Sequence, residues 1–405
     1  MTIRGKRVAL CVAAVSVALT AACTSTVSGE AVPGEIDIRT LDVGSYSTDK
    51  SKIFDSLLES EPPILEAVRL ADAVVSPYEV DHKYVYGLGG KLEMNPDDVT
   101  LQLPAFMKPI VAKFGMVMAV RTAAADASIG DGKTFENGAF EGLTATIIRF
   151  PDHAAAKSAA AEMDAADFAW SPDNVAVELP DISDALAHWR PMVPTIGVIV
   201  PHGEFVIAVY AGRHTVDKNA LIAMVTKYIA EQTNRLDQFR PTPVSDFKTL
   251  KQDPDNMLVR MLQPYGTISG PSPESDIVLT PRGFSIFQSD IAGRAQMMDR
   301  FGVDRVAASQ GRFLFRTRDS QAARAFLADA ATVLDKDKQK KKELGPAPGL
   351  PESKCLEYSS PSSPSATKYN CYVAYRRYVA MVKSDQLIDV RQQAAAQYAV
   401  LANNQ

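Results

Sequence analysis

Cysteine is scarce in this chain, with only four among 405 residues. Histidine and tryptophan are nearly as rare, at five and two. So few cysteines exclude a small scaffold braced by many disulfides, and the histidines are too scattered for the paired spacing of a zinc-binding helix. We therefore predict no metal site and expect a surface or helix-capping position for each histidine: His82, His153, His188, His202 and His214.

The chain also lacks a hydrophobic run of the roughly 20 residues that a membrane-spanning helix needs. A shorter apolar run, Val8 to Leu19, follows Arg4, Lys6 and Arg7. Basic residues, a short apolar run and then small residues are the order found in an export signal. We predict that residues 1–22 are such a signal and are removed from the mature chain.

The end of this run, Leu19-Thr20-Ala21-Ala22-Cys23, resembles the lipobox of bacterial lipoproteins, in which the cysteine thiol receives a diacylglyceryl group. Thr20 stands where lipoboxes usually have Leu, Val or Ile. We predict lipidation at Cys23, followed by a tether over residues 23–35 whose small polar residues cannot form a core. The alternative is ordinary cleavage after Ala21 or Ala22, which would release a secreted protein.

An excess of positive charge is absent as well. The formal net charge is -5, and removal of residues 1–22, which hold three basic residues and no acidic one, leaves -8. An acidic body gains nothing from the counterion release that drives nucleic-acid binding. We therefore exclude nucleic acid as a partner.

Two cysteines, Cys355 and Cys371, remain for the body, because Cys11 lies within the signal. An exported chain meets an oxidising compartment, which favours a disulfide between them. Two free, buried thiols are the alternative.

The second half of the sequence repeats the pattern of the first. A strand that contains Arg149 and ends at Asp152 precedes an Ala-rich helix, and a strand that contains Arg316 and ends at Asp319 precedes another. Each Asp occupies the position of a helix N-cap, where its side chain accepts hydrogen bonds from free backbone N–H groups. A hairpin and a helix then follow in each half, over 198–209 and 217–232 and again over 372–382 and 385–401.

This order predicts an α+β fold of two related halves, each a mixed β-sheet with helices packed on one face, built as a pseudo-duplicated β-α-β-β-α unit. Chance similarity between Ala-rich helices is the alternative. We place an N-terminal domain at 36–240, a linker at 241–275 and a C-terminal domain at 276–405.

Three local predictions accompany these boundaries. The alternation of residues 36–41 favours a first strand, and apolar spacing favours a helix over 105–120. The Pro- and Ser-rich stretch 345–367 reads as a loop.

Catalytic signatures are weak. The spacing Ser-x-x-Lys occurs three times without its companion motifs, and neither a Gly-x-Ser-x-Gly elbow nor a His-Glu-x-x-His helix is present. We assign no catalytic or cofactor-binding residue and expect no cofactor. Trp170 and Trp189 flank an irregular stretch, where they either line a ligand pocket or pack into the core.

Several features together resemble one family: the lipobox, the opening Glu35-Ile36-Asp37-Ile38-Arg39-Thr40-Leu41-Asp42-Val43-Gly44-Ser45-Tyr46, the strand end Phe150-Pro151-Asp152 and the late cysteine pair. It is an uncharacterised family of exported lipoproteins from mycobacteria and related actinobacteria. The resemblance implies a cell-envelope location and a two-part body. It supplies no substrate, cofactor or catalytic residue.

These observations favour a lipoprotein anchored at the outer face of the plasma membrane, and they favour a binding protein over an enzyme. Its expected partners are membrane lipid, through the anchor, and an unknown apolar ligand or envelope protein. A hydrolase with a dispersed active site is the alternative, and a purely structural surface protein is a third hypothesis.

Replacing Cys23 by Ala tests the anchor. We expect the wild-type protein to leave the membrane fraction only with detergent, because two or three acyl chains give stable attachment. The Cys23→Ala variant should no longer fractionate in this way, which membrane fractionation with immunoblotting measures. Recovery of both proteins in the same detergent-dependent fraction contradicts the prediction.

Overall fold

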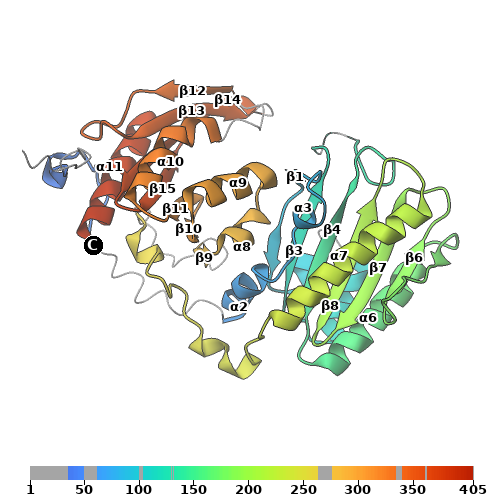
Figure 1. The fold of residues 1–405 in the computed structure, drawn as a ribbon. Helices are drawn as coiled ribbons and strands as arrows, with labels where there is room; N and C mark the ends of the chain where they lie inside the picture. The colour runs from blue at the N-terminus through green and yellow to red at the C-terminus, as the bar shows by residue number, and fades with distance from the viewer. Residues whose placement is uncertain are drawn as a thin grey trace, which may run out of the picture. The chain divides into compact units, whose positions relative to one another are not determined.

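Two β-sheets make up the fold (Figure 1). The computed structural model describes residues 35–49, 62–99, 104–128, 130, 132–262, 276–333, 340–360 and 363–404. The predicted signal, Cys23 and nearly all of the tether lie outside these residues. Both sheets belong to one compact unit, Ile38–Gln405.

The first sheet has the order β1-β3-β4-β8-β7-β6-β5, with β2 paired to β3. Its strands are β1 (Tyr86–Gly87), β2 (Lys91–Glu93), β3 (Met118–Ala125), β4 (Gly142–Arg149), β5 (Val175–Ala176), β6 (Leu186–Trp189), β7 (Thr195–His202) and β8 (Phe205–Gly212).

The second sheet has the order β9-β10-β11-β15-β14-β13-β12. Its strands are β9 (Ile277–Leu279), β10 (Arg305–Ser309), β11 (Arg312–Arg316), β12 (Lys340–Leu344), β13 (Lys354–Ser360), β14 (Ser363–Tyr375) and β15 (Tyr378–Ser384).

The two sheets follow the same path, which confirms the α+β class and the two related halves. A long helix follows the equivalent strands β4 and β11, and another follows β8 and β15. Arg149 and Arg316 occupy equivalent places. Arg149 ends β4 opposite the first residue of β8, and Arg316 ends β11 opposite the first residue of β15. The long helices are α6 (His153–Phe168), α7 (Lys218–Gln238), α10 (Ser320–Val333) and α11 (Leu387–Asn403).

Short helices complete the two halves. They are η1 (Ile38–Thr40), α2 (Pro62–Ala71), α3 (Pro77–Val80), α4 (Pro96–Val99), η2 (Ala105–Met107), α5 (Lys108–Lys113), η3 (Val244–Thr249), η4 (Leu258–Arg260), α8 (Pro281–Ser285) and α9 (Ile291–Phe301). None of the helices in the described part of the chain is both long enough and apolar enough to span a membrane.

The prediction of mixed sheets is wrong, because the strand pairs of the described residues are antiparallel. Strands joined by a tight turn, such as β7 and β8, must run in opposite directions. The crossover through α6 leads to β5 at the far edge of the sheet rather than to a neighbour of β4. No parallel neighbour therefore arises at the crossover.

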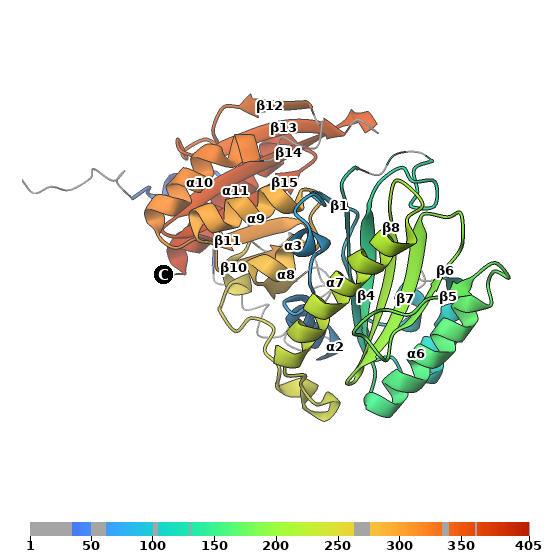
Figure 2. The same cartoon turned by 45° about the vertical axis from the view of Figure 1, so that its right-hand side comes forward.

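The prediction of helices on one face is also wrong. On one face of the first sheet, Val198 and Ile207 pack in the same cluster as residues of α7. On the opposite face, Ile199 and Val206 pack against Ala160 and its neighbours in α6. The central strands are apolar on both sides, so each face needs its own helix (Figure 2).

The local predictions differ from the structure in three places. Residues 36–41 contain η1 (Ile38–Thr40) rather than a strand. The helix expected over 105–120 ends at Lys113, because Gly115 adopts a positive φ of 71° and turns the chain into β3. The stretch 345–367, expected to be a loop, contributes β13 and the start of β14.

The segment after η1 packs on α11. Tyr46 donates a hydrogen bond to Asp389, at 2.7 Å between Oη and Oδ1. Near the other end of the helix, Asn403 donates to the carbonyl of Thr48 at 2.9 Å. Residues 42–48 are therefore attached to the second half, although they precede the first half in sequence.

Both predicted caps are present, and so is the predicted disulfide. Asp152 accepts a hydrogen bond from the backbone N–H of Ala155 at 2.8 Å. Asp319 accepts one from Ala322 at 2.7 Å. Cys355 and Cys371 lie directly opposite each other on β13 and β14, and their sulfurs are bonded.

Arg149 joins four segments of the first half. Its guanidinium donates to Glu66 of α2 at 3.1 Å, to Glu204 in the β7–β8 turn at 2.6 Å and to the carbonyl of Thr242 after α7 at 2.7 Å. Glu66 is fully buried, and it also accepts from Arg69 and from the N–H of Thr242.

Removing this guanidinium should destabilise the protein strongly. We expect Arg149→Met to lower the free energy of unfolding by about 3 kcal/mol or more, since it leaves the buried Glu66 carboxylate with only the part-exposed Arg69 as a countercharge. Lys113→Met is the matched control, because its pair with Glu162 is exposed and contributes less than about 1 kcal/mol. Urea denaturation measures both, and equal losses would contradict the assigned role of Arg149.

Candidate functional site

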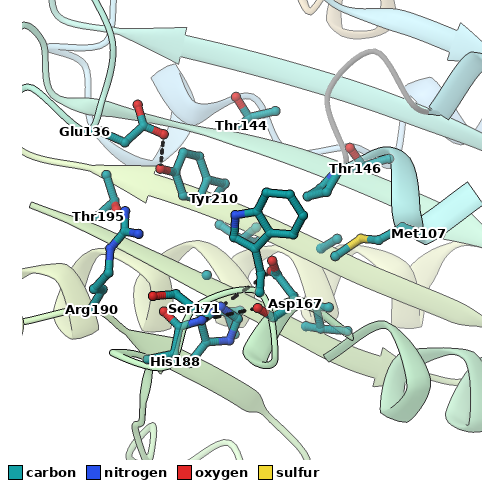
Figure 3. A pocket seen from close by; sticks show the side chains of 18 of the residues that line it. Met107, Glu136, Thr144, Thr146, Asp167, Ser171, His188, Arg190, Thr195 and Tyr210 are labelled. Carbon is teal, nitrogen blue, oxygen red and sulfur yellow. Dashed lines mark hydrogen bonds and ion pairs between the residues drawn. The ribbon is translucent and has the colours of Figure 1, made fainter. Parts of the chain in front are cut away.

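A cavity of about 490 Å³ lies on the face of the first sheet that also carries α6 (Figure 3). Ile199, Ala208 and Met107 line it and also belong to the cluster that packs under α6. Polar side chains of the same sheet, such as those of Thr144, Thr146 and Tyr210, line the cavity as well. The cavity is of the size that small-molecule sites usually have.

The floor of the cavity is a row of residues across four neighbouring strands. Thr144 of β4 lies opposite Tyr210 of β8, Tyr210 lies opposite Gly197 of β7, and Gly197 lies opposite His188 of β6. Thr146 lines the cavity one row further along. Successive strands thus present hydroxyl, phenol and imidazole groups at one level.

Gly197 is required where the row crosses β7. A Cβ atom there would lie 3.2 Å from Nε2 of His188 and 3.6 Å from Oδ2 of Asp167. The missing side chain therefore makes room for the His188 ring. A larger residue would push the ring out of place.

The His188 ring lies between two carboxylates of α6. Asp164 and Asp167 each approach a ring nitrogen to 3.5 Å. The two aspartates are three residues apart and so share one side of the helix. Burial raises the pKa of Asp167, with His188 opposing that shift and Asp164 adding to it.

Glu136 and Tyr210 form a second polar group. The Tyr210 hydroxyl donates a hydrogen bond to Glu136. Although burial alone would raise the pKa of Glu136, this hydrogen bond, other hydrogen bonds and the charge of Arg190 hold it below its usual value. Arg190 and Thr195 line the cavity beside them. The cavity thus holds a carboxylate at Glu136 and another at Asp167, with one guanidinium.

Trp170 lies in the loop that follows α6, and 73% of it is exposed. Its ring stacks on Phe106, with 5.3 Å between centroids and 27° between planes. The loop is held in a tight conformation, because the Asn174 amide donates to the carbonyls of Asp167 and Phe168. A large aromatic surface is therefore presented to solvent at the cavity by a fixed loop.

The arrangement offers binding groups but no assembled nucleophile. Within the described residues, hydrogen bonds and ion pairs of the histidine rings lead to carbonyl oxygens and carboxylates, not to a serine or cysteine. The Ser171 hydroxyl, which lines the cavity, accepts from the N–H of Asp173. No group of three metal-ligating side chains occurs in the part of the chain that the structure describes.

The residues singled out from the sequence are distributed unevenly around this cavity. Trp170 lines it, whereas the indole N–H of Trp189 donates to the carbonyl of Val193 and its ring does not line the cavity. The surface position expected for His188 is wrong, because only 8% of the residue is exposed. Cys355 and Cys371 belong to the second sheet, and Cys23 lies outside the described residues.

One signal for the floor was present in the sequence. Thr144 and Thr146 alternate with Leu143, Ala145 and Ile147 along a strand that is otherwise apolar. In a strand buried on both faces, two hydroxyls at alternate positions lie on the same face. Burying them there is costly unless that face borders a polar space. No comparable pattern in the sequence marks Glu136 or Arg190 as cavity residues.

At the positions equivalent to the cavity floor, the second half carries different residues. By the match of Arg149 with Arg316, Thr144 corresponds to Gly311, which lies in the turn before β11. Tyr210 corresponds to Lys383, whose side chain lies over Gly311, within 1.9 Å of where a Cβ atom would be. The duplicated fold therefore carries different side chains at this place in each half.

Comparison with known sequences shows the family. The chain matches the domain of unknown function DUF7373, with its N-terminal part at residues 59–252 and its C-terminal part at 257–404. The chain therefore belongs to this family, and the two parts correspond to the two sheets. No match was found among curated proteins.

A solved structure with some likeness is the extracellular domain of PknH from Mycobacterium tuberculosis. The match covers 41% of this chain and 94% of that chain, at 9% sequence identity and a TM-score of 0.29. A likeness this weak carries no argument about function.

The raised pKa of Asp167 predicts a pH-dependent stability difference. Because the pKa is higher in the folded state, the stability that the protonated group contributes is lost as the pH rises from 3.8 through the folded value. We expect Asp167→Asn to be more stable than the wild type at pH 7, with the difference shrinking toward acid pH. Urea denaturation at several pH values measures it.

Asp173→Asn, in the exposed loop nearby, controls for the substitution itself. An Asp167→Asn variant less stable than the wild type at pH 7 would show that the attraction to His188 outweighs the burial.

Proposed function

We propose that this member of the DUF7373 family is an envelope lipoprotein that binds a small polar molecule in the cavity of its first half. The observation that carries the proposal is the exposed Trp170 beside a floor of polar side chains. A concave site that joins an aromatic face to a few convergent polar groups is the usual form of a small-molecule site.

The location is argued from the N-terminal sequence. The predicted signal and the lipobox-like stretch ending at Cys23 favour export and acylation. The disulfide between Cys355 and Cys371 is consistent with an oxidising compartment. The anchor would then hold the acidic body at the outer face of the plasma membrane.

Binding is favoured over hydrolysis by the contacts of His188. A general base must reach a nucleophile, either directly or through one water, and the groups at its two nitrogens are Asp164 and Asp167. Carboxylates on both sides fix the ring in place. A ring held in this way forms a fixed part of the cavity wall.

The lining also favours a polar ligand over the apolar one that the sequence suggested. A hydrocarbon in the cavity would cover the hydroxyls of Thr144 and Thr146 without offering a hydrogen bond. Covering an unpaired polar group costs about 1 to 3 kcal/mol. A ligand with its own donors and acceptors avoids this cost.

Native mass spectrometry of protein released from the envelope in mild detergent tests the proposal. We expect the mature wild-type protein to carry an additional small molecule, and expect Trp170→Ala to lose it. Ile388→Ala is the matched control, because Ile388 is 73% exposed like Trp170 but belongs to α11 of the second half. A wild-type protein with no bound molecule would contradict the proposal.

A further inference from the structure

The cavity combines an exposed aromatic face with side chains that both donate and accept hydrogen bonds. From this combination we infer that its ligand is a neutral saccharide. The inference rests on the proposed function, because it names the ligand class of the same cavity.

Trp170 supplies the apolar surface that a sugar ring requires. One face of a pyranose or furanose ring presents C–H groups, which are attracted to the negative face of an indole. Phe106 stacks on the Trp170 ring, and most of the tryptophan nevertheless stays exposed. The hydrogen bonds that hold the loop give the indole a fixed orientation before the ligand arrives, which lowers the entropy lost on binding.

The polar lining matches the hydroxyl groups of a sugar. Each hydroxyl donates one hydrogen bond and accepts others, so its site needs partners of both kinds. Asp167 and Glu136 accept, and the Arg190 guanidinium donates. Thr144 and Thr146 carry hydroxyls that do either. The cavity therefore supplies both kinds of partner around one aromatic face.

Other ligand classes fit this lining less well. An anion would meet the carboxylates of Glu136 and Asp167, and like charges repel. An ammonium group only donates, so it offers no acceptor to the Arg190 guanidinium. A hydrocarbon would leave Thr144 and Thr146 without partners. A neutral molecule rich in hydroxyls meets none of these objections.

A glycan array followed by calorimetry tests the inference. The probe is the mature wild-type protein with its disulfide intact, applied to an array of neutral and acidic saccharides. We expect binding to neutral saccharides, and isothermal titration calorimetry with the best of them gives the dissociation constant. Methylammonium chloride, inorganic phosphate and toluene represent the ammonium, anion and hydrocarbon classes in the same calorimeter.

Two matched pairs of variants locate the binding. Trp170→Ala should raise the dissociation constant at least tenfold, whereas Trp189→Phe, at the tryptophan outside the cavity, should leave it unchanged. Thr144→Val should weaken binding severalfold, and Thr122→Val should not, because Thr122 is buried on the neighbouring strand β3 and does not line the cavity. Circular dichroism confirms that each variant is folded.

The possible failures are distinguishable. Trp170-dependent binding of phosphate or methylammonium, with no saccharide bound, overturns the inference and leaves the proposed function standing, whereas Trp170-dependent binding of toluene alone overturns both. Saccharide binding that survives Trp170→Ala overturns the assignment to this cavity. No binding of any probe, with no molecule found on the envelope protein, overturns both.

Discussion

The first half depends on one buried charge pair. Glu66 on α2 is fully buried, and it pairs with the buried Arg149, at the end of the central strand β4, as well as with the part-exposed Arg69 of its own helix. A buried pair of this kind adds little net stability, but losing one partner is costly because the other charge remains. The pair therefore fixes where α2 lies relative to the strand, and with it the arrangement of everything that packs on α2.

The equivalent arginine of the second half also forms ion pairs, but with different carboxylates. Arg316 ends β11 as Arg149 ends β4, and it donates to Asp304 and Asp255. Asp255 and Thr242 both belong to the segment between α7 and β9, so the equivalent arginines hold two points of the same connection. A sequence expected to serve only as a linker is thus bonded to both halves.

Local features of the sequence predicted the structure well where the causes are local. The caps at Asp152 and Asp319 and the repeated order of strand, helix, hairpin and helix depend on neighbours in sequence. The pairing of residues 345–367 depends instead on a partner strand and on the bond between Cys355 and Cys371. Likewise, the sequence of a strand that is apolar on both faces does not show which helix packs on which face.

The cavity shows the same division. Trp170 was singled out together with Trp189 as flanking an irregular stretch, and it lines the cavity, whereas its role toward a ligand stays a prediction. His188 did not stand out, since its environment comes from an aspartate pair on α6 and a glycine on β7 that only the sheet register brings together.

The attachment of residues 42–48 to α11 has a mechanical consequence. Any tension that reaches the body along the chain from its N-terminal side acts first on the contacts of Tyr46 and Thr48 with the second half. The sheet that forms the cavity comes later along the chain and is shielded from that force. Such a force is therefore taken up by the second half before it reaches the half that contains the cavity.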